Sequence, residues 1–272
     1  MVYIDLNVRA ADGRVCAAEL QRLGFATVAV NAEFASDDKL KQAAAVHSLP
    51  LTAGGGDGRG MKKSKTYTPA VANALQLAAV GGSQVRAVQQ LKRVTLKVDD
   101  VNGAMAIDSS AAVKSFDIVA AEATSPKVFQ FLCEQANVDV ITFDITNRMP
   151  FQLKRPWVDA AIKRGVFFEI MYAPSLSDSA GRRYFFSNAS NLVRVTGGRH
   201  LLLSSGATRD ILLRAPYDVI NIGVLVGLTY AQALDAVSSS GLDVIARAAK
   251  RRGKADVVLE TARAVQDVVM RE

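Results

Sequence analysis

Three carboxylates are the side chains in this sequence best suited to metal chemistry. Asp5, Asp144 and Glu169 lie at or near the carboxyl ends of expected β-strands. Carboxylates in such places can hold Mg²⁺ together with water molecules. The same groups also form hydrogen bonds with loop backbones and polar neighbours, and we expect this second role here. The two histidines, His47 and His200, lie in separate predicted elements and so cannot assemble a metal cluster.

The segment Ser204, Ser205 and Gly206 is a candidate phosphate site. It follows an expected strand, and loops after the late strands of a barrel often bind phosphate through their N–H groups. Arg209 lies close by in the sequence and would add positive charge. An ordinary turn is the alternative. No catalytic residue is predicted, because neither cysteine lies beside a histidine and no Ser nucleophile motif is present.

Basic residues form short groups, in keeping with a net charge of +7. Positive charge favours a polyanionic partner such as nucleic acid, although a soluble basic enzyme could have the same composition. Arginine also binds phosphate through two parallel hydrogen bonds. Contact with RNA or with a partner subunit is the functional interpretation, and solvated surface charge the alternative, for Lys154, Arg155, Arg182, Arg183, Arg209 and Arg214.

Two further basic runs lie at 62–65 and 250–254. They could add nonspecific, salt-sensitive affinity for nucleic acid or act as a nuclear address, and solvated surface charge explains them equally well. Aromatic residues do not alternate with the basic ones. We therefore expect no sequence-specific reading of bases.

The segment 138–174 predicts how these groups are positioned. A β-branched run at 138–143 is typical of a strand buried on both faces. Pro156 suits the first turn of a helix, and Gly165 suits the left-handed residue that ends one. A second apolar strand follows at 166–171. Strand, helix and strand in this order predict a parallel βαβ unit.

The same alternation recurs along the chain and predicts an α/β fold, a single TIM-barrel-like (β/α) domain over 1–272. An eighth strand at 220–228 is uncertain, because Asn221 and two glycines interrupt it. Residues 50–69 predict a flexible Gly/Lys-rich loop insertion, and 250–272 a basic C-terminal helical segment. Seven strands are clear, at 2–6, 26–31, 93–98, 116–121, 138–143, 166–171 and 200–204.

Cysteine usage and hydropathy favour a protein inside the cell. Cys16 and Cys133 lie in apolar helical patterns and predict buried, reduced thiols. No apolar run reaches the roughly 18 residues of a membrane span, and no signal-peptide pattern opens the chain. We expect no membrane partner.

Three segments in a fixed order resemble a known family. They are FDITNRMPFQLKRPWVDAAIKRGVFFEIMYAPSL from Phe143, RRYFFSNASNLVRVTGGRHLLLSSGA from Arg182 and RAPYDVINIGVLVGL from Arg214. Together they closely resemble the ribonuclease P protein subunit of the thirty-kilodalton type, from about residue 138 to 228. The resemblance is weaker but collinear at 3–31, and it fails in the Gly/Lys-rich loop and near the C-terminus.

The resemblance implies a non-catalytic subunit of ribonuclease P, and of its relative ribonuclease MRP. Such a chain binds and stabilises the catalytic RNA that removes the 5′ leader of precursor tRNA. Mg²⁺ would serve that RNA, and this chain would bind no cofactor. The family's barrel is related to polymerase-and-histidinol-phosphatase phosphoesterases, which carry a His-x-His pair after their first strand. Asp5 and Asn7 stand in that place here, so the inherited metal site is expected to be lost.

Partners and location follow from the same resemblance. It implies contact with ribonuclease P RNA and precursor tRNA, with a small subunit of RNA-recognition-like fold, and with a second copy of this chain. It also implies that the protein is located in the nucleus, within the nucleolus, if the cell is eukaryotic, and in the cytoplasm if the cell is archaeal. The alternative function is a divergent metal-dependent phosphoesterase that uses Asp5, Asp144 and Glu169.

Overall fold

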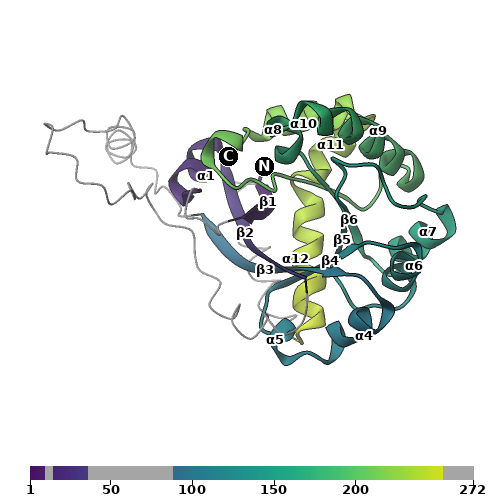
Figure 1. Ribbon diagram of the computed structural model, residues 1–272. Helices are drawn as coiled ribbons and strands as arrows, with labels where there is room; N and C mark the ends of the chain where they lie inside the picture. Colours follow the sequence, from purple (N-terminus) through teal and green to yellow (C-terminus); the bar gives the residue numbers. More distant parts are fainter. Residues whose placement is uncertain (10–14, 36–87, 254–272) are drawn as a thin grey trace, which may run out of the picture.

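A computed structural model describes residues 1–9, 15–35 and 88–253 of the chain (Figure 1). Several predicted features lie outside these residues. They are the Gly/Lys-rich loop at 50–69, His47, and the basic segment beyond Gly253.

The described residues contain a sheet of seven parallel strands in chain order. The last strand returns to the first: the Gly206 N–H donates to the Asn7 carbonyl at 2.8 Å, and the Arg9 N–H to the Ala207 carbonyl at 2.9 Å. The sheet is therefore a nearly closed barrel, as predicted. The strands are β1 (Tyr3–Arg9), β2 (Phe25–Phe34), β3 (Gln89–Val98), β4 (Ile118–Ala123), β5 (Val140–Thr142), β6 (Phe167–Met171) and β7 (Leu201–Ser204).

The uncertain eighth strand at 220–228 is not formed in the structure. Most of that segment lies in helix α10 (Pro216–Leu225), whose first position is proline, a residue suited to a helix start. Gly223 is needed for close packing and does not mark a strand. A Cβ atom there would lie 2.7 Å from Leu203 and 2.9 Å from Ala233, so glycine lets α10 approach β7 and the next helix.

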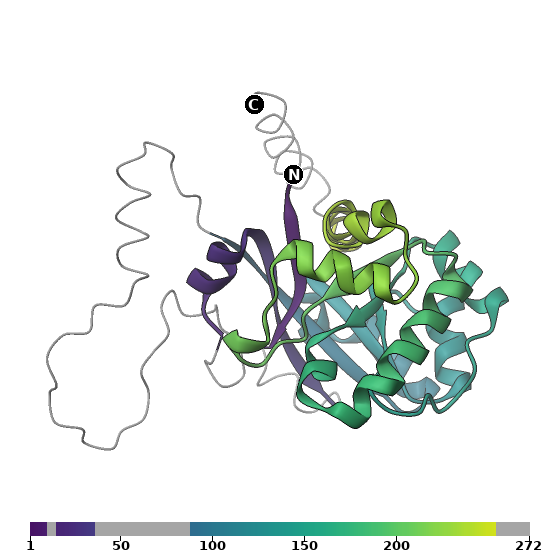
Figure 2. The same ribbon diagram turned by 90° about the horizontal axis from the view of Figure 1, so that it is seen from above.

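Helices cover the outside of the barrel, and α6, α7 and α9 pack in succession along one flank (Figures 1 and 2). Two of the helices, α4 and α5, meet at Ser110. The helices, with one 3₁₀ turn, are α1 (Ala17–Leu23), α4 (Val101–Ser109), α5 (Ala111–Lys114), α6 (Pro126–Glu134), α7 (Arg155–Lys163), α8 (Ala173–Ser177), α9 (Ser179–Thr196), η2 (Asp210–Leu212), α10, α11 (Tyr230–Ala236) and α12 (Ser239–Arg251).

The barrel interior has an apolar layer and a polar layer. Alternate residues of a strand face opposite sides, so β6 directs Phe168 and Ile170 toward the outer helices and Phe167 and Glu169 inward. Helix α12, seen end-on in Figure 2, packs on the apolar layer at the amino ends of the strands. The polar layer is left at the carboxyl ends, which we call the barrel mouth. The apolar layer comprises Ile4, Leu6, Ala29, Ile118, Ala120, Val140, Phe167 and Leu202, with Val244 and Ala248 of α12.

Cys16 and Cys133 are buried free thiols, as predicted. Burial raises the pKa of the Cys133 thiol, which keeps it protonated. Within the described part of the chain, no helix is both long and apolar enough to cross a membrane.

Candidate nucleic-acid interface

A buried ion pair fills the barrel mouth. Two guanidinium nitrogens of Arg93 donate to the two carboxylate oxygens of Glu169, each at 2.6 Å, and both side chains are 0% exposed. Ser204 Oγ donates to the same carboxylate at 2.7 Å. Burial alone would raise the pKa of Glu169, but Arg93 and these hydrogen bonds hold it below its usual range. Glu169 is therefore ionised and already neutralised within the chain.

Arg93 was missed by the sequence analysis. Its side chain also donates to the Leu6 carbonyl at 2.8 Å, so it ties β3 to β1 and β6 across the barrel. The available signal was period-two polarity in β3, where Arg93 and Thr95 share the inward face. A buried arginine needs a carboxylate partner, and that requirement points to Glu169.

Asp5 is a second buried carboxylate at the mouth. Its Oδ1 accepts from the N–H groups of Asn7 at 3.0 Å and Ser205 at 3.1 Å. Its Oδ2 has no hydrogen-bond partner among the described residues. Desolvation is the largest influence on this group and raises the pKa of Asp5 to about 6.

Asp144 lies apart from the other two carboxylates, on the loop after β5. It is exposed and accepts from Thr146 Oγ1 at 2.7 Å and Asn147 Nδ2 at 2.8 Å. Partial burial acts to raise the pKa of Asp144, but these hydrogen bonds outweigh it and lower the pKa.

All three carboxylates accept hydrogen bonds from the chain, the role expected for them, with Asp5 and Glu169 at the mouth and Asp144 apart from them. Across residues 1–9, 15–35 and 88–253, no three His, Cys, Asp or Glu side chains are grouped to hold a metal ion. The donor set needed by a metal-dependent phosphoesterase does not fit this mouth. The alternative function has no support in the geometry.

The phosphate site predicted at Ser204, Ser205 and Gly206 does not agree with their bonding. All three lie in the buried connection that closes the barrel. The N–H of Ser205 donates to Asp5, and that of Gly206 to Asn7. These donors are used within the chain, because they join β7 to β1, and so none of them is available to a phosphate.

The predicted basic residues lie instead on helices and loops that follow strands β5, β6 and β7, around the outside of the mouth. We call these six residues the basic rim: Lys154, Arg155, Arg182, Arg183, Arg209 and Arg214. Asn188 of α9 joins the first two segments, since its Nδ2 donates to the carbonyls of Ile145 at 3.0 Å and Asn147 at 2.8 Å. The loop leading to α7 is thereby fixed against α9.

Lys154 and Arg155 begin helix α7. The Lys154 ammonium lies 4.5 Å from the centre of the Trp157 ring, a cation–π contact. Arg155 is 72% exposed and faces Asp159 at 3.8 Å. Exposed ion pairs at this spacing contribute little to stability, so Arg155 can accept an external anion at small cost.

Arg182 and Arg183 lie near the start of helix α9. Arg182 Nε donates to the Ser175 carbonyl at 3.2 Å, whereas Arg183 is exposed, and its side chain has no partner in the described ranges. Cations are unfavourable near a helix N-terminus, where the backbone carries partial positive charge. An external anion would relieve that repulsion.

Two exposed aromatic side chains lie beside these arginines on α9. Tyr184 is 45% exposed and Phe186 38% exposed, both on α9. Exposed rings beside arginines suit stacking with unpaired bases. The sequence RRYFF places these two rings directly beside Arg182 and Arg183.

Arg209 and Arg214 flank η2 after β7. Arg209 is exposed, and its guanidinium has no partner in the described part of the chain. Arg214 is held more firmly, since its Nη1 donates to the carbonyls of Ile211 at 2.9 Å and Leu213 at 2.7 Å. Arg209 is the freer of the two for an external contact.

The amino-acid sequence matches a known protein family. Residues 2–253 match the family described as RNase P subunit p30. The chain belongs to this family. The resemblance predicted from 138–228 is confirmed, and the match extends it over the weaker N-terminal part.

Several proteins of known name are similar to this p30-family chain. An Arabidopsis thaliana protein named GAMETOPHYTE DEFECTIVE 1 is 40% identical over 165 residues, which are 60% of this chain and 28% of that protein. Ribonuclease P protein subunit p30 of Mus musculus is 38% identical over 156 residues, 57% of this chain and 58% of that protein. Ribonuclease P/MRP protein subunit RPP1 of Saccharomyces cerevisiae is 32% identical over 136 residues, 50% and 46% of the two chains. The matched segments thus span less than two thirds of these relatives.

Solved structures confirm the barrel fold. A chain in a cryo-EM structure of archaeal ribonuclease P with mature tRNA aligns with a TM-score of 0.56, covering 91% of each chain at 13% identity. Ochratoxinase of A. niger aligns with a TM-score of 0.51, covering 90% of this chain and 71% of that one at 9% identity. At such identities the likeness concerns the fold alone.

The C-terminal basic run of this p30-family chain is not solvated surface throughout. Arg251 is 9% exposed and donates to Asp139 at 2.9 Å, and Arg252 donates to Asp117 at 2.5 Å. These pairs fix the end of α12 to the amino ends of β4 and β5. Lys250 is exposed.

Proposed function

We propose that this chain is a non-catalytic protein subunit of ribonuclease P and of ribonuclease MRP. It binds and stabilises the catalytic RNA that removes the 5′ leader from precursor tRNA. The match to the RNase P subunit p30 family over residues 2–253 carries the proposal. The names of the mouse and yeast relatives support the assignment to both particles.

The distribution of charge supports a role in RNA binding. At the mouth, Glu169 is bonded to Arg93 within the barrel, which leaves no open carboxylate pair for metal-assisted hydrolysis. On the basic rim, Arg155, Arg183 and Arg209 are exposed to solvent. Such side chains neutralise RNA phosphates and release counterions, which lowers the cost of folding a polyanion. The RNA binds the Mg²⁺ ions that the reaction uses, and this chain binds no cofactor.

The proposal includes partners and location. The chain contacts ribonuclease P RNA and precursor tRNA, a small protein subunit of RNA-recognition-like fold, and a second copy of itself in the same particle. It acts in the nucleus and nucleolus of a eukaryotic cell, or in the cytoplasm of an archaeal one. These points rest on the family membership.

Purification of the tagged chain from its own cells at moderate salt tests the proposal. Bound RNA is sequenced, bound proteins are identified, and the eluate is assayed for cleavage of precursor tRNA. One abundant structured RNA with 5′-leader cleavage is the expected result. Recovery of proteins without RNA, or of cleavage that survives micrococcal nuclease, would contradict the proposal.

A further inference from the structure

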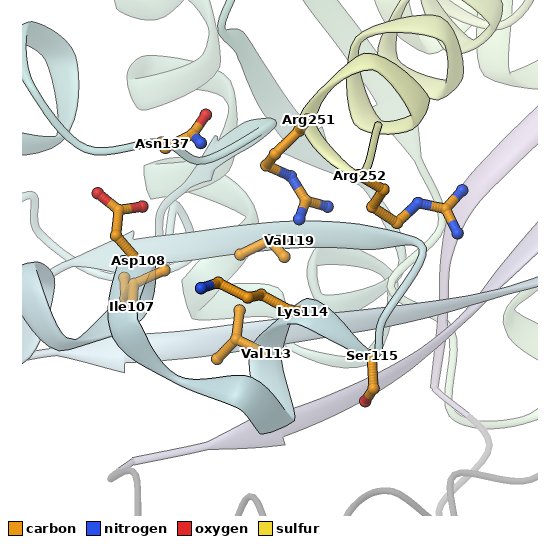
Figure 3. A pocket seen from close by; sticks show the side chains of 9 residues that line it. All are labelled: Ile107, Asp108, Val113, Lys114, Ser115, Val119, Asn137, Arg251 and Arg252. Carbon is orange, nitrogen blue, oxygen red and sulfur yellow. The ribbon is translucent and has the colours of Figure 1, made fainter. Parts of the chain in front are cut away.

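A polar cavity of about 320 Å³ lies at the amino end of the barrel, opposite the mouth (Figure 3). It is enclosed by the end of α4, by α5, by the starts of β4 and β5, and by the end of α12. Its volume is of the size that takes one small molecule. The polar side chains that line it are Asp108, Lys114, Ser115, Asn137, Arg251 and Arg252.

Two arginines on one side of the cavity are held in place from behind. Arg251 uses Nε and Nη2 to bond Asp139, and Nη2 also donates to the Asp117 carbonyl at 3.2 Å. No hydrogen bond from its Nη1 to a described residue is present, and Nη1 is not one of the buried unpaired atoms of these residues. Arg252 donates from Nη1 to Asp117, while its buried Nε is unpartnered within the same residues.

The free donor of Arg251 suits an anion. Its acidic partner Asp139 occupies the Nε and Nη2 edge of the guanidinium, which orients the side chain and leaves Nη1 for a ligand. The guanidinium of Arg252 is directed away from the other polar side chains in Figure 3, so this residue adds positive charge to the wall of the cavity.

The other side of the cavity has a different chemistry. Figure 3 shows Asp108 and Asn137 across from the two arginines, with the side chain of Lys114 running between them. Lys114 is exposed and has no ion pair in the described part of the chain. The carboxylate of Asp108 would repel a wholly anionic ligand, whereas it would accept hydrogen bonds from hydroxyl or amino groups.

We propose that this cavity binds a ribonucleoside phosphate. Arg251 and Lys114 take the phosphate, and Asp108 with Asn137 takes the ribose hydroxyls or the base edge. Only a ligand that is anionic at one end and a hydrogen-bond donor at the other satisfies both sides. The nucleotide is either free or part of an RNA strand. The site lies at the opposite end of the barrel from the basic rim.

Methyl NMR of the full 272-residue chain tests the proposal, because Ile107, Val113 and Val119 line the cavity and report on its occupation. The probes are adenosine 5′-monophosphate, inorganic phosphate and a single-stranded RNA octamer. Adenosine 5′-monophosphate is expected to shift these methyl signals and to bind at least about tenfold more tightly than inorganic phosphate. Octamer binding at the same methyls would assign the site to RNA, and its absence would assign it to the free nucleotide.

Two variants and a control complete the test. Lys114→Ala is expected to weaken nucleotide binding about five- to tenfold, since one charge-assisted contact is removed. Asp108→Ala is expected to abolish the preference for the nucleotide over phosphate. Lys127→Ala, an exposed lysine on α6, is the control and should leave binding unchanged. Absence of shifts at millimolar nucleotide, equal affinity for phosphate, or equal loss in Lys127→Ala would overturn the proposal.

Discussion

The mouth of the barrel and its basic rim both contain arginines that face carboxylates, but the pair at the mouth is buried and the pair on the rim is exposed. At the mouth, Arg93 and Glu169 are fully buried and bonded to each other. On the rim, Arg155 is 72% exposed and its nearest carboxylate lies 3.8 Å away. Buried charges of this kind must remain paired for the fold to persist, while exposed ones can exchange water for phosphate. The difference separates residues that hold the barrel from residues that can bind RNA.

The largest expected effect comes from breaking the buried pair. Glu169→Gln leaves the Arg93 guanidinium buried without a counter-charge, and it should lower the free energy of unfolding by about 3–5 kcal/mol. Chemical denaturation followed by circular dichroism measures the change. The matched variant is Arg155→Gln on the rim, for which a change below about 0.5 kcal/mol is expected. Similar losses of unfolding free energy in Glu169→Gln and Arg155→Gln would contradict the distinction between a structural mouth and a binding rim.

Asp5 gives a pH-dependent effect of intermediate size. Its folded-state pKa of about 6 exceeds the ordinary value of 3.8, so between these pH values the folded chain keeps a proton that the unfolded chain releases. Stability therefore falls as pH rises through this window and stays lower above it. Asp5→Asn cannot ionise and should raise the free energy of unfolding at pH 8 by up to about 3 kcal/mol, with no gain at pH 4.

Asp144→Asn is the control for that titration. The pKa of Asp144 is lowered in the folded chain, so its contribution to stability is present at neutral pH and is lost on acidification. Asp144→Asn should therefore lower the free energy of unfolding at pH 8, whereas Asp5→Asn should raise it. Denaturation curves at pH 4 and pH 8 distinguish the two, and a stabilising Asp144→Asn would contradict the assignment of partners.

The rim should affect function without affecting the fold. Lys154→Ala with Arg155→Ala removes two exposed cations and should raise the Mg²⁺ concentration that the reconstituted particle needs for half-maximal cleavage by about two- to fivefold. The cause is that Mg²⁺ must then neutralise phosphates that the side chains no longer reach. Thermal unfolding of the isolated variant should shift by less than about 3 °C. An unchanged Mg²⁺ profile would count against the rim.

Local sequence signals predicted most of the barrel because they act over few residues. Pro156 near the start of α7 and the left-handed Gly165 (φ 75°) after it gave the βαβ unit correctly. The segment 220–228 could not be assigned from the sequence, because apolar content does not separate a buried helix from a strand. Gly223 suggested that a strand is interrupted there. The structure gives another reason for the glycine: a Cβ atom at this position would clash with Leu203, which is distant in the sequence.

The site was predicted less well, because burial and pairing depend on distant partners. The sequence could propose Ser204 to Gly206 as a phosphate loop, but not that Asp5 and Asn7 already bind its N–H groups. None of the roles considered for the run at 250–254 included the ion pair that Arg251 forms with Asp139, because the two residues are far apart in the sequence. Arg183 and Arg209 are exposed, as is usual for helix starts and loops after strands, and their contact with RNA stays a prediction.

Salt-dependent RNA affinity of two matched variants tests the central claim most directly. The rim variant is Lys154→Ala with Arg183→Ala, and the control is Lys163→Ala with Arg194→Ala, exposed cations near the other ends of the same two helices α7 and α9. Affinity is measured for the RNA that copurifies with the chain. The rim variant should reduce the slope of log affinity against log salt by about 1–2, because roughly 0.9 is lost per phosphate contact, and the control should leave it unchanged. Equal slopes for the native chain and the rim variant, or an equal loss in the control, would contradict an RNA-binding rim.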